Sequence, residues 1–545
     1  MRYWHTIRHL KPVQLYGRIW FRLFRPRVDL RPPPARRPVA RGAWVPGVER
    51  PVSMRSPTRF EFLNDARDLT EYGWDDPRLG RLWRYHLHYF DDLNACEADS
   101  RRAWHDELLI GWVRDNPPPR GTGWEPYPTS LRIVNWIKWA LRGNTLPGEC
   151  VASLAVQARW LSQRLERHLL GNHLIANAKA LVFAGLFFDG PEAAAWLQRG
   201  LRILAAQLPE QILPDGGQFE RSPMYHAIAL EDLLDLCNLA AAYRPASGPE
   251  WERIVQGWRA LTGPMRVWLR VMSHPDGEIS QFNDAALGIA PAPAALEAYA
   301  ARLGLARPTA PHQVTELRQS GYVRIERGAA VALLDVAPVG PDHVPGHAHA
   351  DTLSFELSLF GQRVLVNSGT SGYGGGAERL RQRGTAAHNT VVVDGENSSE
   401  VWSDFRVARR ARPVGLEVSR DGTIVVRCAH DGYDRLPGKV RHTRSWSMGA
   451  DVLVVRDTIT GAFRSAQARF HLHPSVVVHV VAGQEAVHLA LPNGSSVRLA
   501  VAGGRMRQER TTWHPEFGVS RPNTCIAVDF TGPELTTELS WGVTP

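Results

Sequence analysis

The spacing of apolar residues changes once along this chain, near residue 310, and this change restricts the possible folds more than any other feature. From about residue 60 to 300, apolar side chains recur at intervals of three and four, as in Leu131, Val134, Ile137 and Leu141, which is typical of amphipathic helices. Beyond residue 310 the period is two, and Asp-Gly pairs separate short runs, which indicates strands joined by tight turns. Helices followed by strands, without alternation, argue against a βαβ fold. They predict an α+β chain of stacked helices, a solenoid or a toroid, followed by an antiparallel β-sandwich.

Length and proline content divide the chain into three parts. A chain of 545 residues is too long for a single hydrophobic core. Residues 1–58 hold a basic amphipathic segment and a Pro/Arg-rich connector, residues 59–308 the helices, and residues 309–545 the strands. In the first segment the apolar residues at roughly helical spacing are Trp4, Ile7, Leu10, Leu15, Ile19, Trp20 and Leu23. We expect a helix that docks on the next domain, with a peripheral membrane helix as the alternative.

Charge and composition argue against several classes of function. The net charge of +9 comes mostly from dispersed Arg, which favours recognition of carboxylate, sulfate or phosphate groups rather than nucleic acid. The five cysteines form no CxxC pair, so neither a disulfide framework nor a thiolate zinc site is expected. The sequence shows no run suited to a membrane span and no secretory signal pattern. We therefore expect a bacterial-type soluble protein, cytoplasmic or membrane-peripheral, with a periplasmic location as an alternative.

A histidine-rich stretch leads directly into a strand-like run. The alternating residues are His347, His349, Asp351, Leu353, Phe355, Leu357 and Leu359. A period of two predicts one strand with all seven side chains on one face and the polar end at the mouth of a site. Together with His388, which begins a later strand, the two histidines form a plausible zinc set. A hydrated His-rich loop and a metallo-hydrolase site are the alternatives.

Three clusters in the helical half carry groups suited to chemistry. Asn172, before His173, is a natural N-cap for the helix that follows. Ser222-Pro223 is a strong helix start, which puts Tyr225 and His226 in a first turn whose dipole would favour a phenolate. The third cluster offers aromatic planes and a guanidinium for a sugar ring, or for packing, from Trp124, Tyr127 and Arg132.

A glycine-rich turn at residues 367–376 follows a predicted strand and precedes Arg379 and Arg383. It lacks the Lys-Ser/Thr pair and the following helix of a phosphate-binding loop. No nucleotide or organic cofactor is therefore expected.

Four motifs follow one another along the chain: GNHLIANAKAL, PDGGQFERSPMYH, HAHADTLSFELSLFGQRVLVNSGTSGYG and RGTAAHNTVVVDG. Taken together and in this order, they resemble the heparinase II/III family of polysaccharide lyases, which includes related alginate lyases. The resemblance covers the chain from about residue 70 onward. It implies an (α/α) toroid followed by antiparallel sheets, with the active site in the cleft between them. It also implies β-elimination at a uronic acid of an acidic polysaccharide.

The resemblance also assigns roles to residues at matching positions. Asn172 or His173 would neutralise the substrate carboxylate, Tyr225 would be base, acid or both, and His347 would be its partner. Cationic neighbours and the helix start would lower the pKa of Tyr225, since a free tyrosine, with a pKa of about 10, is a poor base. Substrate-binding side chains are expected among Trp124, Tyr127, Arg132, Glu220, Arg221, His226, Arg379 and Arg383.

The family's structural metal site falls on His349, Asn367 and His388. Zinc-binding members carry Asp where this chain has Asn367, and a neutral amide is a poor zinc ligand. We expect either a divalent metal, zinc first, or a metal-free pair of hydrogen-bonded histidines, with Asp351 bracing one His.

Two other functions fit the same residues. A non-catalytic protein of exopolysaccharide biosynthesis could bind an anionic polysaccharide in this cleft. A metal-dependent hydrolase could use the histidine cluster. Only a lyase would produce unsaturated uronate, which absorbs in the ultraviolet.

Overall fold

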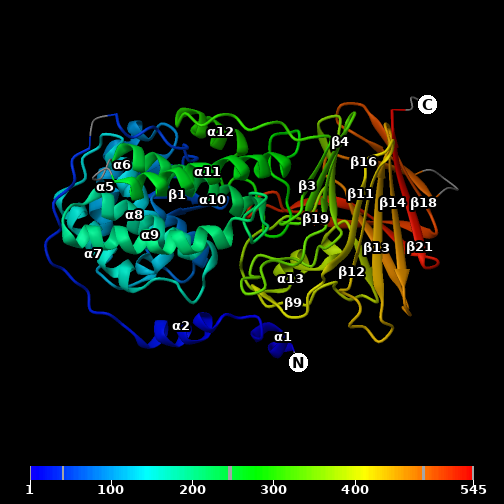
Figure 1. Cartoon of the computed structure of the whole chain (residues 1–545), viewed down its shortest axis with the longest axis horizontal. Coiled ribbons are helices and arrows are strands. Elements are labelled where there is room, and N and C mark those ends of the chain that lie inside the picture. The colour runs from blue at the N-terminus through cyan, green and yellow to red at the C-terminus, as the bar shows by residue number, and fades with distance from the viewer. Residues whose placement is uncertain (1, 40–41, 244–247, 481–484, 543–545) are drawn as a thin grey trace.

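The computed structural model describes residues 2–39, 42–243, 248–480 and 485–542. Helices form the body at the left of Figure 1 and antiparallel sheets form the body at the right. The predicted α+β organisation, an (α/α) toroid followed by an antiparallel sandwich, is confirmed. The last helix of the first body ends at Arg302 and the first strand of the second begins at Val314. The change of period near residue 310 thus lies between the two bodies.

The helical body consists of helices that pack as neighbours around a core rich in tryptophan. Their bounds are α3 (Leu69–Tyr72), α4 (Arg81–Tyr89), α5 (Arg102–Asp115), α6 (Pro126–Leu141), α7 (Gly148–Gln163), α8 (Gly171–Phe187), α9 (Pro191–Gln211), α10 (Pro223–Ala242), α11 (Pro249–Val271) and α12 (Pro293–Arg302). α8 packs against α6 and α9, and the approach of α8 to α9 depends on Gly185 and Gly200. A Cβ at Gly185 would lie 2.6 Å from the backbone nitrogen of Leu197, so only glycine fits there.

Two short helices precede the helical body. α1 (Arg2–Ile7) and α2 (Pro12–Leu23) lie along the lower edge of Figure 1, apart from the other helices. α2 docks through Phe21, whose ring lies 4.3 Å from the ring of His168, between centroids. No helix in the described ranges is long and apolar enough to cross a bilayer.

The start of the region predicted as helical is a hairpin instead. β1 (Arg59–Phe62) pairs with β2 (Asp65–Asp68). Leu63 and Asn64 make the turn with positive φ values of 56° and 58°. Phe60 and Phe62 point into the helical core, because alternate residues of a strand share a face.

The β body contains three antiparallel sheets within the described residues. The first has the order β3 (Val314–Leu317), β4 (Tyr322–Arg327), β5 (Ala330–Asp335), β6 (Phe355–Leu359), β7 (Gln362–Leu365). The second has the order β11 (Pro413–Ser419), β12 (Ile424–His430), β13 (Arg441–Met448), β14 (Val452–Thr460), β21 (Glu534–Trp541), β18 (Ser496–Ala502), β17 (Ala486–Ala490), β16 (Val477–Val480). The third has the order β19 (Gly504–Trp513), β20 (Arg521–Phe530), β15 (Ala466–His471), β8 (Val391–Val393). The β body also contains a short antiparallel pair, β9 (Val401–Trp402) with β10 (Arg406–Val407), and the helix α13 (Ala377–Arg383).

The histidine-rich stretch is a loop and not the strand that its period predicts. β6 begins only at Phe355, and Leu353 has a φ of 64°, which no strand adopts. Contacts from distant segments fix the loop: the backbone nitrogen of Ala350 donates to the carbonyl of Arg383 (2.9 Å), and that of His349 to the side-chain oxygen of Asn283 (3.0 Å). The prediction failed because these long-range hydrogen bonds outweigh the local pattern.

An apolar cluster fixes the two bodies against each other beside the cleft. It joins the end of α11 to the first sheet and contains Trp268, Val271, Met272, Phe282, Leu317, Tyr322 and Leu333. The indole nitrogen of Trp268 also donates to the hydroxyl of Ser320 (2.8 Å). Side chains from both bodies can therefore hold a defined geometry across the cleft.

A buried ion pair in the second sheet also binds the backbone of two loops, at Leu353 and Asn389. Arg444 and Asp457 lie opposite each other on β13 and β14, and both are fully buried. Arg444 also donates to the carbonyls of Leu353 (2.8 Å) and Asn389 (2.6 Å). Burial alone would raise the pKa of Asp457, but Arg444 and His442 hold it at about 2.

We expect Asp457→Asn to lower the free energy of unfolding by about 3–5 kcal/mol at pH 7, because Arg444 would be left buried and unpaired. The folded-state pKa of about 2 lies below the unfolded value of about 3.9, so the carboxylate stabilises the fold fully above pH ~4. The difference in the free energy of unfolding between wild type and variant, measured by urea titration, should therefore narrow as the pH falls from about 4 towards 2.

The matched control is Asp529→Asn, since Asp529 pairs with Arg507 on the exposed surface of the same body. Such a pair contributes about 0–1 kcal/mol. Equal losses in the two variants would contradict a special role for the buried pair.

Candidate active site

A cleft of about 2140 Å³ lies between the two bodies. The helical body contributes Asn172, His173 and Tyr225 to its wall, and the β body contributes His347 and Tyr373. Residues that are far apart in the sequence and were predicted to act together therefore line one cavity. The cleft also reaches α1 and α2, which line it with residues including Gln14, Arg18 and Phe21.

Tyr225 and His347 face each other across the boundary between the bodies. Tyr225 lies in the first turn of α10, as predicted, because Ser222 caps the helix by accepting the backbone N–H of Tyr225 (3.3 Å) and Pro223 is its first residue. The rings of Tyr225 and His347 stack with centroids 3.9 Å apart and planes at 28°. The Tyr225 hydroxyl lies 2.7 Å from the hydroxyl of Tyr373. Both phenols and the imidazole thus meet at one point of the cleft.

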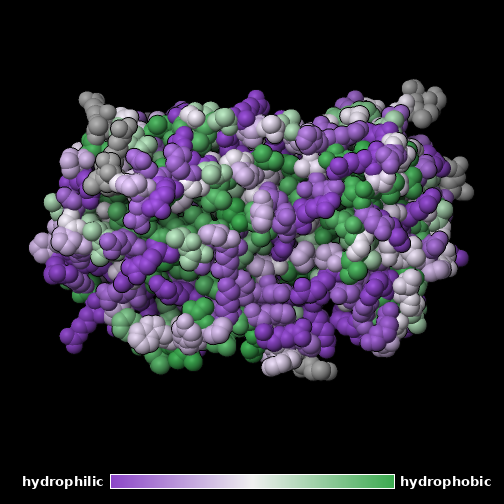
Figure 2. Space-filling view, in the orientation of Figure 1, coloured by the Kyte–Doolittle hydropathy of each residue, from purple (hydrophilic) through white to green (hydrophobic). Residues whose placement is uncertain are grey.

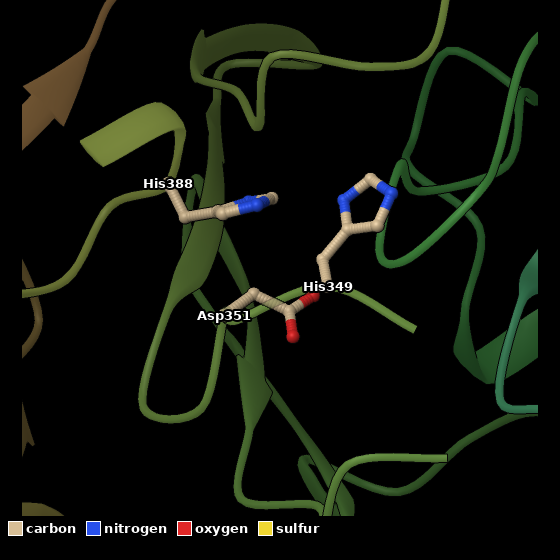
Figure 3. Close-up of side chains that lie close together, drawn as sticks. All are labelled: His349, Asp351 and His388. Carbon is tan, nitrogen blue, oxygen red and sulfur yellow. The ribbon is translucent and has the colours of Figure 1, made fainter. Parts of the chain in front are cut away.

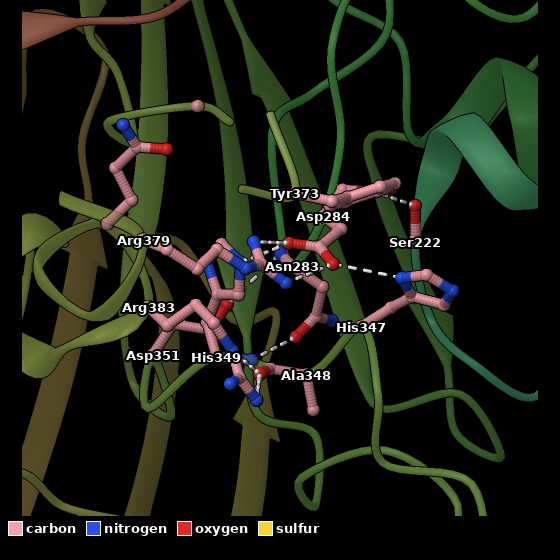
Figure 4. A network of polar contacts seen from close by, with 12 residues as sticks. Ser222, Asn283, Asp284, His347, Ala348, His349, Asp351, Tyr373, Arg379 and Arg383 are labelled. Atoms are coloured by element: carbon pink, nitrogen blue, oxygen red, sulfur yellow. Dashed lines mark hydrogen bonds and ion pairs between the residues drawn. The ribbon is translucent and has the colours of Figure 1, made fainter. Parts of the chain in front are cut away.

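The loop between α11 and α12 places the buried carboxylate of Asp284 beside His347 (Figure 4). Nδ1 of His347 donates to one oxygen (2.9 Å) and Nε2 of His349 donates to the other (2.8 Å). The guanidinium of Arg379 binds both oxygens, with Nη2 2.7 Å from Oδ2. Burial alone would raise the pKa of Asp284, but Arg379 and the two histidines hold it well below its usual range. Asp284 is therefore an anion that fixes the orientation of both imidazoles.

Asp284 is the main residue of the site that the sequence prediction missed. It follows Asn283 in the segment SQFNDAALG, which carries no motif and no helical or strand period. Asn283 has a φ of 57°, and its side chain donates to the carbonyl of Arg221 (3.0 Å) while accepting the backbone N–H of His349. The only available signal was an Asn-Asp pair in an otherwise apolar segment.

The pKa of Tyr225 is raised, contrary to the prediction. Burial is the largest cause, followed by Tyr373, and the Asp284 carboxylate adds to the effect. The prediction relied on the helix start and on cationic neighbours. Arg379 is cationic, but Asp284 already neutralises it. The Tyr225 hydroxyl therefore keeps its proton in the free protein.

A second polar cluster surrounds Asn172 and His173. Asn172 is the second residue of α8, so it is not the predicted N-cap, a position held by Leu170. Instead, its backbone and side-chain nitrogens lie 3.2 and 3.3 Å from Oε1 of Glu220. Oε2 of Glu220 lies 3.6 Å from Nε2 of His347, which ties the two clusters together.

His173 contacts both a carboxylate and an aromatic ring. Its Nδ1 lies 3.1 Å from Glu166, and its ring lies 4.4 Å from that of Tyr127, between centroids. Burial would lower the pKa of His173, but the charges of Glu166 and Glu220 raise it above its usual value. His173 thus offers a proton and a positive charge on the helical side of the cleft.

His349, Asp351 and His388 form a buried cluster (Figure 3). Each offers a ligand atom, and these atoms lie within 4.8 Å of one another. Nε2 of His349 donates to Asp284 and Nδ1 of His388 donates to the amide oxygen of Asn367 (3.1 Å). Nδ1 of His349 and Nε2 of His388 are buried without a hydrogen-bond partner among the described residues. These nitrogens carry lone pairs, and burial lowers the pKa of His349 to about 4, so the ring stays neutral.

The contacts of Asn367 and Asp351 bear on the predicted metal set. Asn367 makes hydrogen bonds on both sides of its amide, because its oxygen accepts from His388 and its nitrogen donates to Glu356 (3.1 Å). Asp351 does not brace a histidine, since its side chain accepts the backbone N–H of Asn283 (3.3 Å). Asp284 braces His349, and Asp351 stands among the three candidate ligands.

Several side chains predicted to bind substrate are instead buried structural groups. Arg132 is fully buried, with its guanidinium 3.8 Å from the Trp112 ring centroid and its Nε bonded to Gln157 (3.0 Å). Arg221 donates to the carbonyl of Ser320 (2.9 Å). His226 stacks on Trp268 at 4.2 Å and bonds the carbonyl of Met265 (2.9 Å). All three belong to the core. The prediction failed because an amphipathic pattern does not show which hydrogen bonds a buried polar side chain makes.

Arg379 and Arg383 of α13, also predicted to bind substrate, are likewise buried structural groups. Arg379 is committed to Asp284, and Arg383 donates to the carbonyls of Ala348, Ser403 and Asp404. Trp124 is 3% exposed and donates to the carbonyl of Asn116 (3.0 Å). Trp124 and Tyr127 both line the cleft, and of the two Tyr127 contacts His173.

Two cations at the edge of the cleft were not predicted. Arg18 of α2 and Arg406 of β10 both line it. Burial lowers the pKa of Arg18, and the positive charge of Arg406 lowers it further. Neither pairs with a carboxylate in the part of the chain that the structure describes. This edge could therefore accept an anionic group.

Two family descriptions match the chain, one for each body. Residues 104–296 match "Heparinase II/III N-terminus" and residues 309–542 match "Heparinase II/III-like, C-terminal". Together the two matches include Asn172, Tyr225, Asp284 and His347. The resemblance seen in the sequence is confirmed.

Individual relatives match to different extents. A heparin-sulfate lyase of Bacteroides stercoris is 28% identical over 253 residues, which is 43% of this chain but 37% of that protein. The FtsZ-localized protein C of Caulobacter vibrioides is 26% identical over 455 residues, covering 77% of this chain and 74% of that protein. A crystal structure of heparinase III superposes with a TM-score of 0.67 at 19% identity, over 85% of this chain and 76% of that one. The matched region spans well under half of the heparin-sulfate lyase, and the structural likeness shows a shared fold.

Proposed function

The chain belongs to the heparinase II/III family, and we propose that it is a polysaccharide lyase that cleaves an acidic, uronate-containing polysaccharide by β-elimination. The observation that carries the proposal is the stacked Tyr225–His347 pair, with His347 bonded to the buried Asp284. An oriented imidazole and a neutral phenol at one point supply a base and an acid for one elimination. The name of one relative, heparin-sulfate lyase, supports the same reaction class.

In the proposed reaction, Nε2 of His347 removes the proton from C5 of the uronate. Donation of Nδ1–H to Asp284 leaves the lone pair on Nε2, and the carboxylate stabilises the imidazolium that forms. The electron pair of the C5–H bond becomes the C4–C5 double bond as the C4–O bond breaks. The Tyr225 hydroxyl, which burial keeps protonated, donates its proton to the leaving oxygen. The products are an unsaturated uronate and a new hydroxyl end. His347 then releases its extra proton to solvent, and the Tyr225 phenolate takes a proton back from solvent.

The substrate carboxylate must be neutralised for the C5 proton to be acidic enough. We assign this role to Asn172 and His173, which lie on the same wall of the cleft as Tyr225. The side chain of Asn172 offers an N–H, and His173 offers a cation whose pKa the neighbouring glutamates raise. Arg18 and Arg406 would bind a more distant anionic group of the polymer.

The test is an ultraviolet assay of the full chain against a panel of heparan, chondroitin, alginate and other uronate polymers. A lyase generates new absorbance from the conjugated double bond. Saturable, salt-sensitive binding without new absorbance would instead identify the non-catalytic binder. Loss of polymer length without absorbance, sensitive to chelator, would identify the hydrolase.

We also propose that His349, Asp351 and His388 hold a divalent metal, zinc first. The fit rests on two buried imidazole nitrogens with free lone pairs beside a carboxylate. Burial raises the pKa of Asp351 to about 6, a cost that a bound cation would relieve. Bound there, the ion would fix the ring of His349 and, through Asp284, the ring of His347.

Metal content checks this proposal without reference to activity. The purified protein should contain about one zinc-like ion per chain, and chelator should lower its melting temperature. His388→Ala should remove the ion. Asn367→Ala should weaken binding by roughly 10–100-fold, since Asn367 only orients His388. If neither the native protein nor zinc-supplemented protein retains metal, the cluster is a metal-free hydrogen-bonded pair.

A further inference from the structure

The outward face of α1 and α2 is apolar, although nothing in the described structure covers it. Trp4 is 67% exposed, Trp20 is 61% exposed and Leu23 is 78% exposed. Leu15, Tyr16 and Ile19 on the same side of α2 are also largely exposed. Figure 2 shows hydrophobic atoms at the lower edge of the molecule, where Figure 1 places α2. A patch of this kind marks an interaction surface, because single exposed apolar residues are common but contiguous ones are not.

The inward face of α2 is already used, so the helix is not free to turn its apolar side inward. Gln14 is buried and donates to the carbonyl of His343 (2.9 Å). Phe21 lies against His168 and beneath the guanidinium of Arg164, which is 3.7 Å from the ring centroid. The backbone at Gly17 packs against the same His168, where a Cβ would lie 3.2 Å from the histidine Cβ. This arrangement is the reverse of an ordinary surface helix, whose apolar side packs inward.

α1 is fixed in the same way on the β body. The Trp402 indole donates to the hydroxyl of Thr6 (3.1 Å), and the Tyr3 ring lies edge-on to Trp402 at 5.1 Å. Trp4 is 67% exposed, and Ile7, which also borders the cleft, is 44% exposed. The two helices thus present their aromatic and aliphatic side chains along one edge of the molecule.

The segment that carries this apolar edge has charged side chains of a single sign. Residues 1–28 contain six Arg and one Lys and no Asp or Glu. The exposed members Arg2, Arg8, Arg22, Arg25 and Arg27 make no ion pair with a carboxylate within the described residues. A second copy of the chain would therefore face this edge with the same positive charge, which opposes self-association.

We propose that α1 and α2 dock the protein on the surface of an anionic lipid bilayer. Trp4, Trp20 and Leu23 enter the boundary between head groups and acyl chains, where tryptophan is favoured. The surrounding arginines lie among the negatively charged head groups. The positive charge of the segment and its exposed apolar edge together favour an anionic bilayer as the binding partner.

The docked helix also borders the cleft. Gln14, Arg18 and Phe21, on the inward side of α2, line it. Docking would therefore hold one edge of the cleft close to the membrane, so that a polysaccharide chain at the bilayer surface is within reach. The docking itself does not depend on the proposed lyase activity.

Sedimentation of the full chain with vesicles tests the proposal. We expect binding to vesicles of equal parts phosphatidylglycerol and phosphatidylcholine, and at least ~10-fold weaker binding to phosphatidylcholine alone. The triple variant Ile19→Gln/Trp20→Gln/Leu23→Gln should bind the anionic vesicles on the order of 10-fold or more weakly, because it removes apolar area only from the outward face. Arg22→Gln/Arg25→Gln should reduce both the binding and its dependence on salt.

The matched control is Val477→Gln/Val480→Gln, on β16, since these valines are 55% and 70% exposed but lie far from α2 in the chain and in Figure 1. Vesicle binding by this control should equal that of the wild type. Equal binding by the wild type and the triple variant, or no preference for anionic vesicles, would overturn the proposal. A wild-type dimer that the triple variant makes monomeric, without vesicle binding, would also overturn it and assign the edge to self-association.

Discussion

Replacing Tyr225 by Phe is expected to reduce the rate of unsaturated uronate formation by about 10²–10⁴-fold, the range for loss of a general acid or base. The variant keeps the aromatic ring that stacks on His347 at 3.9 Å, so the cleft geometry should survive. Only the hydroxyl is lost, and with it the proton for the leaving oxygen. The measurement is the initial rate of ultraviolet absorbance on the best polymer, together with a thermal melt that shows the variant is folded.

The control for this prediction is Tyr373→Phe. Tyr373 bonds Tyr225 through its hydroxyl, so its removal takes away the same hydrogen bond from the other side. It leaves the Tyr225 proton in place, and we expect a loss of no more than about 10-fold, the value of one modest hydrogen bond. A Tyr225→Phe variant as active as Tyr373→Phe would remove Tyr225 from the proposed chemistry.

Replacing Asp284 by Asn should lower kcat by about 10²–10⁴-fold while leaving KM nearly unchanged. Asp284 is buried and does not line the cleft, so it acts only as a positioning residue for His347. An amide cannot accept from His347, His349 and Arg379 at once, so His347 would lose its fixed tautomer. The variant should also be about 3–5 kcal/mol less stable, since Arg379 would remain buried without its counter-ion.

Arg379→Gln separates these two effects. It breaks the same buried ion pair, and a comparable loss of stability is expected. The bond from Nδ1 of His347 to Asp284 remains, however, so kcat should fall much less than in Asp284→Asn. If both variants lost kcat equally, or if Asp284→Asn raised KM instead, Asp284 would be a purely structural anion.

The sequence predicted the organisation of the fold because apolar spacing reports local geometry directly. The stripe that contains Ile137 became α6, and the Ser222-Pro223 start became the capped first turn of α10. The same kind of local pattern predicted a strand from His347 to Leu353, and this prediction is wrong. There, a positive φ at Leu353 and bonds from Asn283 and Arg383 impose a loop.

The sequence by itself determined the order of the two bodies and most of the residues that could react. Their types and neighbours placed Asn172, Tyr225 and His347 in one family pattern. Only the tertiary structure decided what each polar group is paired with. It joined Asp284 to His347, assigned Arg379 to that carboxylate and not to substrate, and left α2 with its apolar side outward. Pairing depends on groups far apart in the chain, and desolvation makes each buried charge sensitive to them, so no local pattern can report it.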